Sequence, residues 1–204
     1  GICAVNLTRN SDHSYTADVG DHIKKFMTRI GMDNVPAALT PSRPDFNDES
    51  NNKTLVNAKD YQMKIGNLVF YLPIRMDIHR QVKELARSMQ SPDVFHSNHL
   101  FHLLRYLKGS ADLGPRYSAD IKDFPNGVEL YVSADSAFAN MHNKQSTGAY
   151  TLSIGQNNAP FKVYSNVARG IYTNPAESEY CNLSIAAKEI QYWRYFLEEL
   201  GQGA

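Results

Sequence analysis

The chain is poor in cysteine: its 204 residues include only two, Cys3 and Cys181. Two cysteines so far apart build neither a disulfide framework nor a cysteine-based metal site, and they suit a reducing, intracellular environment. Long apolar runs are missing as well, so the sequence predicts no membrane-spanning helix, no signal peptide and no membrane partner.

Neither positive nor negative charge is in excess, because 21 Lys and Arg residues balance 21 Asp and Glu residues. Any contact with a polyanion therefore depends on a local basic face. A hydrophobic content of 42% and an aromatic content of 11% indicate a folded chain, and the length suits one or two domains. The chain begins with Gly1 rather than Met, which indicates a fragment or a piece cut from a longer polyprotein.

The first half of the sequence is typical of helices. Residues 1–10 suit a short strand, and apolar residues at helical spacing predict a helix over 14–30 that ends at Gly31. A polar stretch rich in Pro and Asn follows, and we interpret it as an exposed linker. Three further helices are predicted, which together form a small bundle: 61–72, 78–89 and 98–107.

The pattern changes near Pro125, where segments rich in β-branched and aromatic residues begin. They predict three strands, at 128–135, 146–154 and 161–165. A long helix is expected from Pro175, with Asn174 as its N-cap. The fold class is therefore α+β. The helix carries an apolar stripe, expected to be its core face: Tyr180, Leu183, Ala187, Ile190, Trp193, Leu197 and Leu200.

Three antiparallel-looking strands followed by a long helix form the first half of a ribonuclease H-like fold. That fold brings an Asp at the end of the first strand close to a Glu in the first helix, because two Mg²⁺ ions need hard oxygen ligands. Asp135 ends the first predicted strand, and Glu179 borders the apolar stripe and should lean toward the sheet. Ordinary alternatives are a strand-end turn for Asp135 and a capping carboxylate for Glu177.

Several runs resemble the C-terminal part of a copia-type LTR-retrotransposon reverse transcriptase polyprotein. GICAVNLTR (1–9) and HIKKFMTRIGMDNVPAALTP (22–41) resemble the segment after the polymerase palm. YQMKIGNLVFYLPIRMDI (61–78) resembles the start of the thumb, and HLLRYLKGSADLGPRY (102–117) resembles the helix and turn leading into the ribonuclease H domain. Three further runs resemble the first strand, the second strand and the first helix of that domain: YVSADSAFAN (131–140), KQSTGAY (144–150) and AESEYCNLSIAAKEIQYWRYFLEELG (176–201).

The resemblance implies four regions: a post-palm strand and helix (1–44), a polar linker (45–59), a thumb-like or connection region (60–117) and the first half of a ribonuclease H-like domain (128–204). It implies Mg²⁺-dependent cleavage of the RNA strand of an RNA–DNA hybrid that is held by its backbone. Asp135 and Glu179 would be the catalytic metal ligands. Other parts of the polyprotein are expected partners, and the cytoplasm, a virus-like particle or the nucleus the expected location.

The chain departs from the family pattern at the first of these carboxylates. The family has S-D-A-D where this chain has Ser133-Ala134-Asp135-Ser136. Asp135 matches the metal-binding Asp only if the following loop is one residue shorter; otherwise Ala134 takes the position. Two further ligands are expected beyond residue 201, so this chain is expected to hold half of the two-ion site. Two interpretations stay open: an enzyme fragment, and a catalytically inactive remnant that acts as a binding or assembly module.

Two other groups of residues invite a functional interpretation. His96, His99 and His102 recur every three residues, but their directions drift by about 60° per step, which favours solvated or capping roles over a zinc site. Basic residues of the helical region suit contacts with phosphates, although solvated helix faces account for the same pattern. These candidates for nucleic-acid binding are Arg75, Arg80, Lys83, Arg87, Arg105 and Lys108.

Overall fold

A computed structural model of the chain describes residues 5–46, 48, 53–118, 128–141, 144–156, 158–168 and 170–201. Cys3 and the middle of the expected linker, residues 47 and 49–52, lie outside the described residues. The chain forms two compact units, Gly1–Thr8 with Ala17–Pro115 and Arg9–Thr16 with Arg116–Ala204. Helices and antiparallel sheets are both present, which confirms the α+β class.

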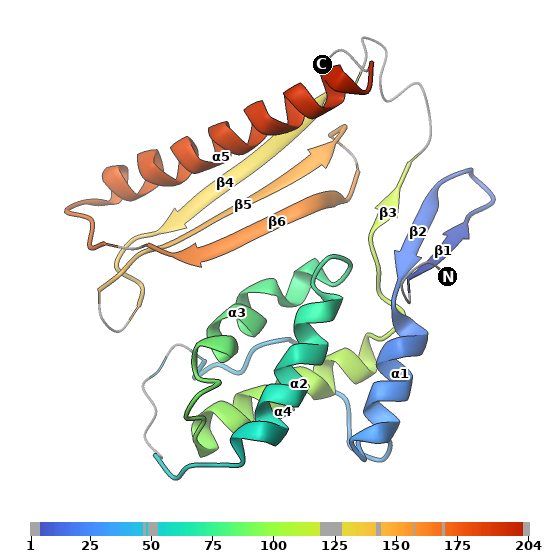
Figure 1. The fold of residues 1–204 in the computed structure, drawn as a ribbon, viewed down its shortest axis with the longest axis vertical. Coiled ribbons are helices and arrows are strands. Elements are labelled where there is room, and N and C mark those ends of the chain that lie inside the picture. The colour runs from blue at the N-terminus through green and yellow to red at the C-terminus, as the bar shows by residue number, and fades with distance from the viewer. Residues whose placement is uncertain are drawn as a thin grey trace. The chain divides into compact units, whose positions relative to one another are not determined.

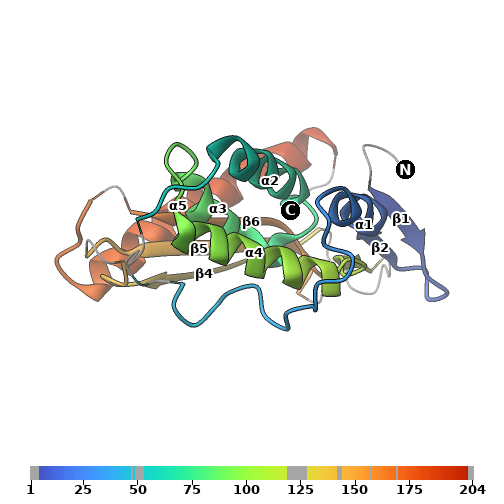
Figure 2. The ribbon, with the colours of Figure 1, turned by 90° about the horizontal axis from the view of Figure 1, so that it is seen from below.

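The first unit is helical, and its helices are seen from two directions in Figures 1 and 2. Helix α1 packs on α4, and α3 packs on both α2 and α4, so that their apolar faces share one buried core. The side chains of Asn57 and Asp93 cap α2 and α4 by accepting hydrogen bonds from backbone N–H groups. The elements are α1 (Gly20–Arg29), α2 (Ala58–Tyr71), the 3-10 turn η1 (Met76–Ile78), α3 (His79–Arg87) and α4 (Val94–Gly109).

The helix expected over 14–30 is shorter than predicted, because its first residues form a strand. β1 (Asn6–Arg9), β2 (Tyr15–Asp18) and β3 (Arg116–Tyr117) form a small sheet in that order, with Tyr15 of β2 opposite Tyr117 of β3. The pairing continues with Thr16 of β2 opposite Arg116 of β3. Tertiary pairing therefore overrides the helical spacing that continues into α1.

The second unit contains a three-stranded antiparallel sheet of order β4-β5-β6, and helix α5 runs along one of its faces (Figure 1). The helix contacts β4 and β5 around a core formed by Tyr150, Leu152 and Ala186. The three strands and the helix lie where they were predicted, within two residues at each end of every strand. Their bounds are β4 (Leu130–Ala137), β5 (Thr147–Ile154), β6 (Pro160–Val167) and α5 (Pro175–Glu199).

Helix α5 begins with the cap that the sequence predicted. The Asn174 side chain accepts a hydrogen bond from the backbone N–H of Glu177 at 2.9 Å, and Pro175 opens the helix. The Glu177 carboxylate in turn accepts from the backbone N–H and the hydroxyl of Thr173, at 2.7 and 2.8 Å. These hydrogen bonds lower the pKa of Glu177, which therefore serves as a capping carboxylate.

The face of α5 that packs on the sheet differs from the predicted stripe in its first half. Tyr180 is 74% exposed and Leu183 is 50% exposed, whereas the buried residues of this half are Ser178, Asn182 and Ala186. In the second half the prediction is confirmed for Ile190, Trp193 and Leu197, which pack inward, but it is wrong for Ala187 and Leu200, which are exposed. The first half of α5 thus approaches the sheet through a row of small and polar side chains.

Candidate functional site

Asp135 lies on β4 opposite Ala149 of β5, and its side chain is exposed. One carboxylate oxygen accepts a hydrogen bond from the backbone N–H of Ser136 at 2.9 Å. The preceding residue, Ala134, packs into the core between the sheet and α5. Because successive side chains of a strand point to opposite faces, the Asp135 carboxylate faces away from α5.

Glu179 lies in the first turns of α5 and is exposed. Its neighbour Ser178 belongs to the buried row, and residues one position apart on a helix point about 100° apart. Glu179 therefore lies outside the row that faces the sheet, in contrast to the expectation that it leans inward. The structure does not bring Asp135 and Glu179 to one face, because the two carboxylates occupy different surfaces of the second unit.

A metal pair needs more ligands than these two carboxylates. Across the described residues, no group of three or more His, Cys, Asp or Glu side chains is arranged to hold a metal ion. The described residues therefore do not by themselves form a two-ion centre. The role of Asp135 and Glu179 as metal ligands stays a prediction about the complete polyprotein.

The side chain of Asn182 connects α5 to the sheet, and this contact was not predicted from the sequence. Its amide nitrogen donates hydrogen bonds to the backbone carbonyls of Asp135 at 2.7 Å and Ala149 at 2.9 Å. A Cβ atom at Gly148 would lie only 2.5 Å from Oδ1 of Asn182, so the absence of a side chain there permits the close approach. A glycine inside a predicted strand is a signal of such close approach, and it could have been recognised.

A second missed contact is centred on Glu189 of α5. Its carboxylate accepts hydrogen bonds from the Trp193 indole at 2.9 Å, from the Tyr150 hydroxyl at 3.2 Å and from the Lys162 ammonium. Burial opposes the ionisation of Glu189, but the hydrogen bonds and the charge of Lys162 outweigh it and lower the pKa of the carboxyl. The contact joins α5 to β5 and β6, which makes its role structural.

Three of the six basic candidates serve the helical fold. The Arg75 side chain is 0% exposed and forms an ion pair with Asp77 at 2.7 Å. Arg105 donates to the carbonyl of Pro36 at 2.7 Å, and Lys108 donates to the carbonyl of Val35 at 2.8 Å. Burial removes Arg75 from contact with a phosphate backbone, which corrects that expectation, whereas phosphate contacts of the half-buried Arg105 and Lys108 stay a prediction.

The other three basic candidates lie on α3. Arg80, Lys83 and Arg87 are spaced three and four residues apart, which places them on one side of the helix. Lys83 and Arg87 are exposed, and Arg80 is half-buried. Arg87 lies 3.4 Å from Glu84, and such an exposed ion pair is weak enough for a phosphate to compete with it.

The three histidines have separate environments. His96 Nδ1 lies 2.6 Å from the Asp93 carboxylate, and His102 Nε2 lies 2.9 Å from the carbonyl of Thr40. His99 is buried between the rings of Phe95 and Phe46, with centroid distances of 4.4 and 5.3 Å. Burial lowers the pKa of His99 and keeps its ring neutral. The contact of His96 with the cap residue Asp93 agrees with the expected capping role, whereas the burial of His99 differs from the expected solvated role.

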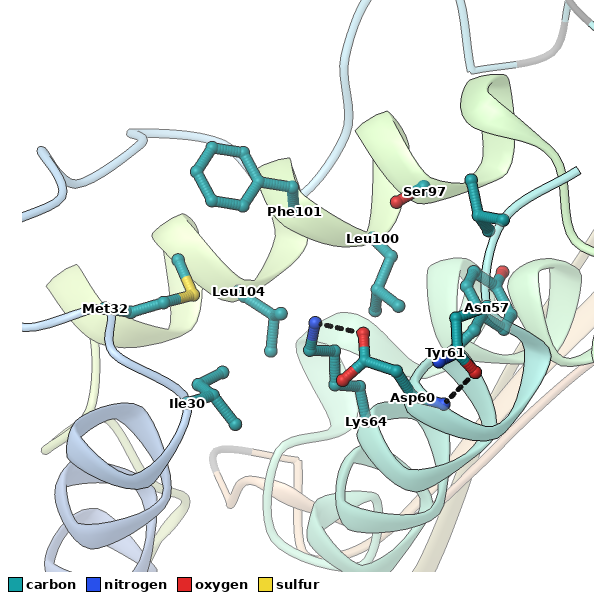
Figure 3. A pocket seen from close by; sticks show the side chains of 11 residues that line it. Ile30, Met32, Asn57, Asp60, Tyr61, Lys64, Ser97, Leu100, Phe101 and Leu104 are labelled. Atoms are coloured by element: carbon teal, nitrogen blue, oxygen red, sulfur yellow. Dashed lines mark hydrogen bonds and ion pairs between the residues drawn. The ribbon is translucent and has the colours of Figure 1, made fainter. Parts of the chain in front are cut away.

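Pockets are found in both units. One pocket of the helical unit, shown in Figure 3, has a volume of about 140 Å³ and lies between α2, α4 and residues 30–32. Its charged groups are paired with each other, because Lys64 binds Asp60 at 2.6 Å, and Asn57 caps α2 (Figure 3). The pocket of the second unit is larger, about 270 Å³, and lies between β5, β6 and the first half of α5.

No helix in the described part of the chain is long and apolar enough to cross a membrane. No family model and no solved structure matches the chain. The curated proteins that match the chain include two of Arabidopsis thaliana, both described as retrovirus-related Pol polyproteins. The polyprotein from transposon RE2 is 26% identical over 94% of this chain, and that from transposon RE1 is 26% identical over 88%. The match covers 12% of each relative's length. Over most of its length, the chain is thus similar to a short part of retrotransposon Pol polyproteins.

Proposed function

We propose that this chain is a segment of a copia-type retrotransposon reverse transcriptase polyprotein that binds an RNA–DNA hybrid through its sugar–phosphate backbone. The segment comprises a thumb-like helical region and the first half of a ribonuclease H-like domain. The similarity to Pol polyproteins over about nine-tenths of the chain carries this proposal. The order of the elements, helices followed by three antiparallel strands and a long helix, supports it.

The phosphate contacts are assigned to α3. Lys83 and Arg87 are exposed on one side of this helix, whereas Arg75, Arg105 and Lys108 are engaged within the fold. A contact with phosphate releases counterions, so its loss lowers both the affinity and the salt dependence of binding. The geometry thus favours a small number of backbone contacts.

The experiment is a titration of the purified protein with a fluorescently labelled RNA–DNA hybrid at several salt concentrations. The double variant Lys83→Gln, Arg87→Gln should bind more weakly, and the slope of log affinity against log salt should fall by roughly 1–2. Lys25→Gln, an exposed lysine of α1, is the matched control. An unchanged slope in the double variant would refute the assignment to α3, and a lack of hybrid binding would refute the proposed function.

Two alternatives differ in whether this segment contributes to catalysis. In the first, the parent polyprotein cleaves the RNA strand, and Asp135 and Glu179 bind Mg²⁺ with ligands from elsewhere in it. In the second, the segment is a catalytically inactive binding or assembly module. The second is favoured by the side chain of Ala134, which occupies the face of β4 toward α5 while Asp135 faces away.

A cleavage assay on the parent polyprotein with Mg²⁺ and a hybrid labelled in the RNA strand separates these alternatives. The first alternative predicts cleavage that Asp135→Asn abolishes. The second predicts no cleavage by the ribonuclease H-like domain, whatever residue stands at 135. Ala134→Asp is the informative gain-of-function variant, since it places a carboxylate on the face toward α5.

A further inference from the structure

Two buried polar groups beside the pocket of the second unit lack partners among the described residues. The hydroxyl of Ser178 and Oδ1 of Asn182 belong to side chains that are 2% and 4% exposed, and neither atom has a hydrogen-bond partner in the described part of the chain. Both residues line the pocket of about 270 Å³ beside α5. Leaving such buried groups unpaired is unfavourable, so the pocket is suited to a ligand that pairs with them.

The orientation of the Asn182 amide is determined by its other contacts. Its nitrogen donates to two backbone carbonyls, those of Asp135 and Ala149, and only the nitrogen can donate. The oxygen therefore lies against Gly148, which also lines the pocket. A ligand that pairs with this oxygen has to present an N–H or O–H donor. The Ser178 hydroxyl can donate or accept at the neighbouring position.

The described walls of the pocket favour an uncharged and flat ligand group. The lining residues that the structure describes carry no charge: Gly148, Tyr164, Asn166, Val167, Ala168, Tyr172, Ser178, Asn182 and Ile185. A phosphate, carboxylate or ammonium group would find no counter-charge among them. The ring of Tyr164 is held by stacking on Tyr150, with a centroid distance of 4.9 Å and an interplanar angle of 14°, and it offers a fixed aromatic wall.

We propose that this pocket binds one unpaired nucleobase of a single-stranded stretch of nucleic acid. A base is neutral and planar, carries donors and acceptors side by side on one edge, and stacks on tyrosine rings. Its edge pairs with Asn182 and Ser178, and its ring lies against the tyrosine wall. The inference rests on the proposed function, because it assumes that nucleic acid reaches the protein.

The test uses adenosine and cytidine as probes, because nucleosides carry a base but no phosphate. Binding is followed by NMR through the Asn182 side-chain amide signals. Gly148→Ala places a methyl group against Oδ1 of Asn182 and should weaken binding at least tenfold. Ser178→Ala removes one hydrogen bond and should weaken it roughly threefold to tenfold. The matched controls are Ser184→Ala, exposed on the same helix, and Gly170→Ala, which has open space around it; both should bind as the unaltered protein does.

The proposal is overturned if the nucleosides leave the Asn182 signals unchanged, or if Ser178→Ala binds them as the unaltered protein does. Ser178→Ala decides the outcome should Gly148→Ala fail to fold. N-acetylglutamine amide is the competing probe: equal or tighter binding of this amide would assign the pocket to a peptide side chain instead. Hybrid binding without nucleoside binding would refute this inference alone, whereas the absence of hybrid binding would refute the proposed function.

Discussion

The guanidinium of Arg75 forms two hydrogen bonds with the carboxylate of Asp77, at 2.9 and 2.7 Å, although the Arg75 side chain is fully buried. It also donates to the backbone carbonyl and the hydroxyl of Ser110, at 2.7 and 2.8 Å. The buried cation thus holds the turn before α3 against the end of α4. A buried charge with all of these partners is a structural element of the helical unit.

Replacing Arg75 by Met should therefore destabilise the protein strongly. The change leaves the Asp77 carboxylate and the Ser110 carbonyl without their partner, and we expect a loss of about 3–5 kcal/mol in the free energy of unfolding. Urea denaturation measures this loss. Arg87→Met, which breaks an exposed ion pair, is the control and should cost about 0–1 kcal/mol. Equal effects of the two substitutions would contradict the buried role of Arg75.

The same ion pair predicts how stability depends on acid. Burial opposes the ionisation of Asp77, but Arg75 and the Tyr106 hydroxyl stabilise the carboxylate and leave its pKa below the ordinary value. The stabilisation is complete above the ordinary pKa of an aspartate and is lost as the pH falls through the lowered pKa. Denaturation at a series of pH values should show the stability difference between the natural protein and Asp77→Asn shrinking in acid. A difference that is independent of pH would refute the prediction.

Two leucines of α5 test which face of the helix is buried. Leu197 is 7% exposed and Leu183 is 50% exposed, although both belong to the apolar stripe of the sequence. Leu197→Ala should lower the free energy of unfolding by about 2–5 kcal/mol, whereas Leu183→Ala should change it by about 0.5 kcal/mol or less. Thermal or urea unfolding compares the two variants directly. A larger effect at Leu183 than at Leu197 would contradict the exposure of the stripe in the first half of α5.

His99 predicts a second way in which the stability of the protein depends on pH. Burial lowers the pKa of this histidine, so the unfolded chain takes up a proton at a higher pH than the folded chain does. Its contribution to stability is therefore complete above the ordinary pKa of histidine and declines as the pH falls from there toward the lowered pKa. His99→Phe, which keeps a ring between Phe95 and Phe46, should flatten the change in stability between about pH 7 and 5. An unchanged slope in that range would contradict this prediction.

Local signals predicted much of the fold. The three strands from β4 to β6 are rich in β-branched and aromatic residues, and Asn174, Pro175 and Glu177 mark the start of α5. These features act within a few residues of the chain, so they are readable before any tertiary contact is known. The strand β2 was missed because its pairing with β3 depends on residues about 100 positions away.

The candidate site was less predictable. Glu179 was placed by helical periodicity against a stripe of large apolar residues, and that stripe turned out to be half exposed. Asp135 was placed at the end of a strand, but only the register of β4 and the packing of Ala134 reveal which face its carboxylate occupies. A shift of one residue along a strand exchanges the two faces, and the sequence around Asp135 allows either register.

The sequence alone determined the α+β class, the order of the helices and strands, and the likeness to retrotransposon polyproteins. Tertiary structure alone decided that Arg75 is interior and that the first half of α5 faces the sheet through Ser178, Asn182 and Ala186. The physical reason is that a helix approaches a sheet most closely where side chains are small. Gly148 permits that approach, and the hydrogen bonds of Asn182 secure it. The contact cannot be predicted from hydrophobic periodicity, because that periodicity depends on apolar residues alone.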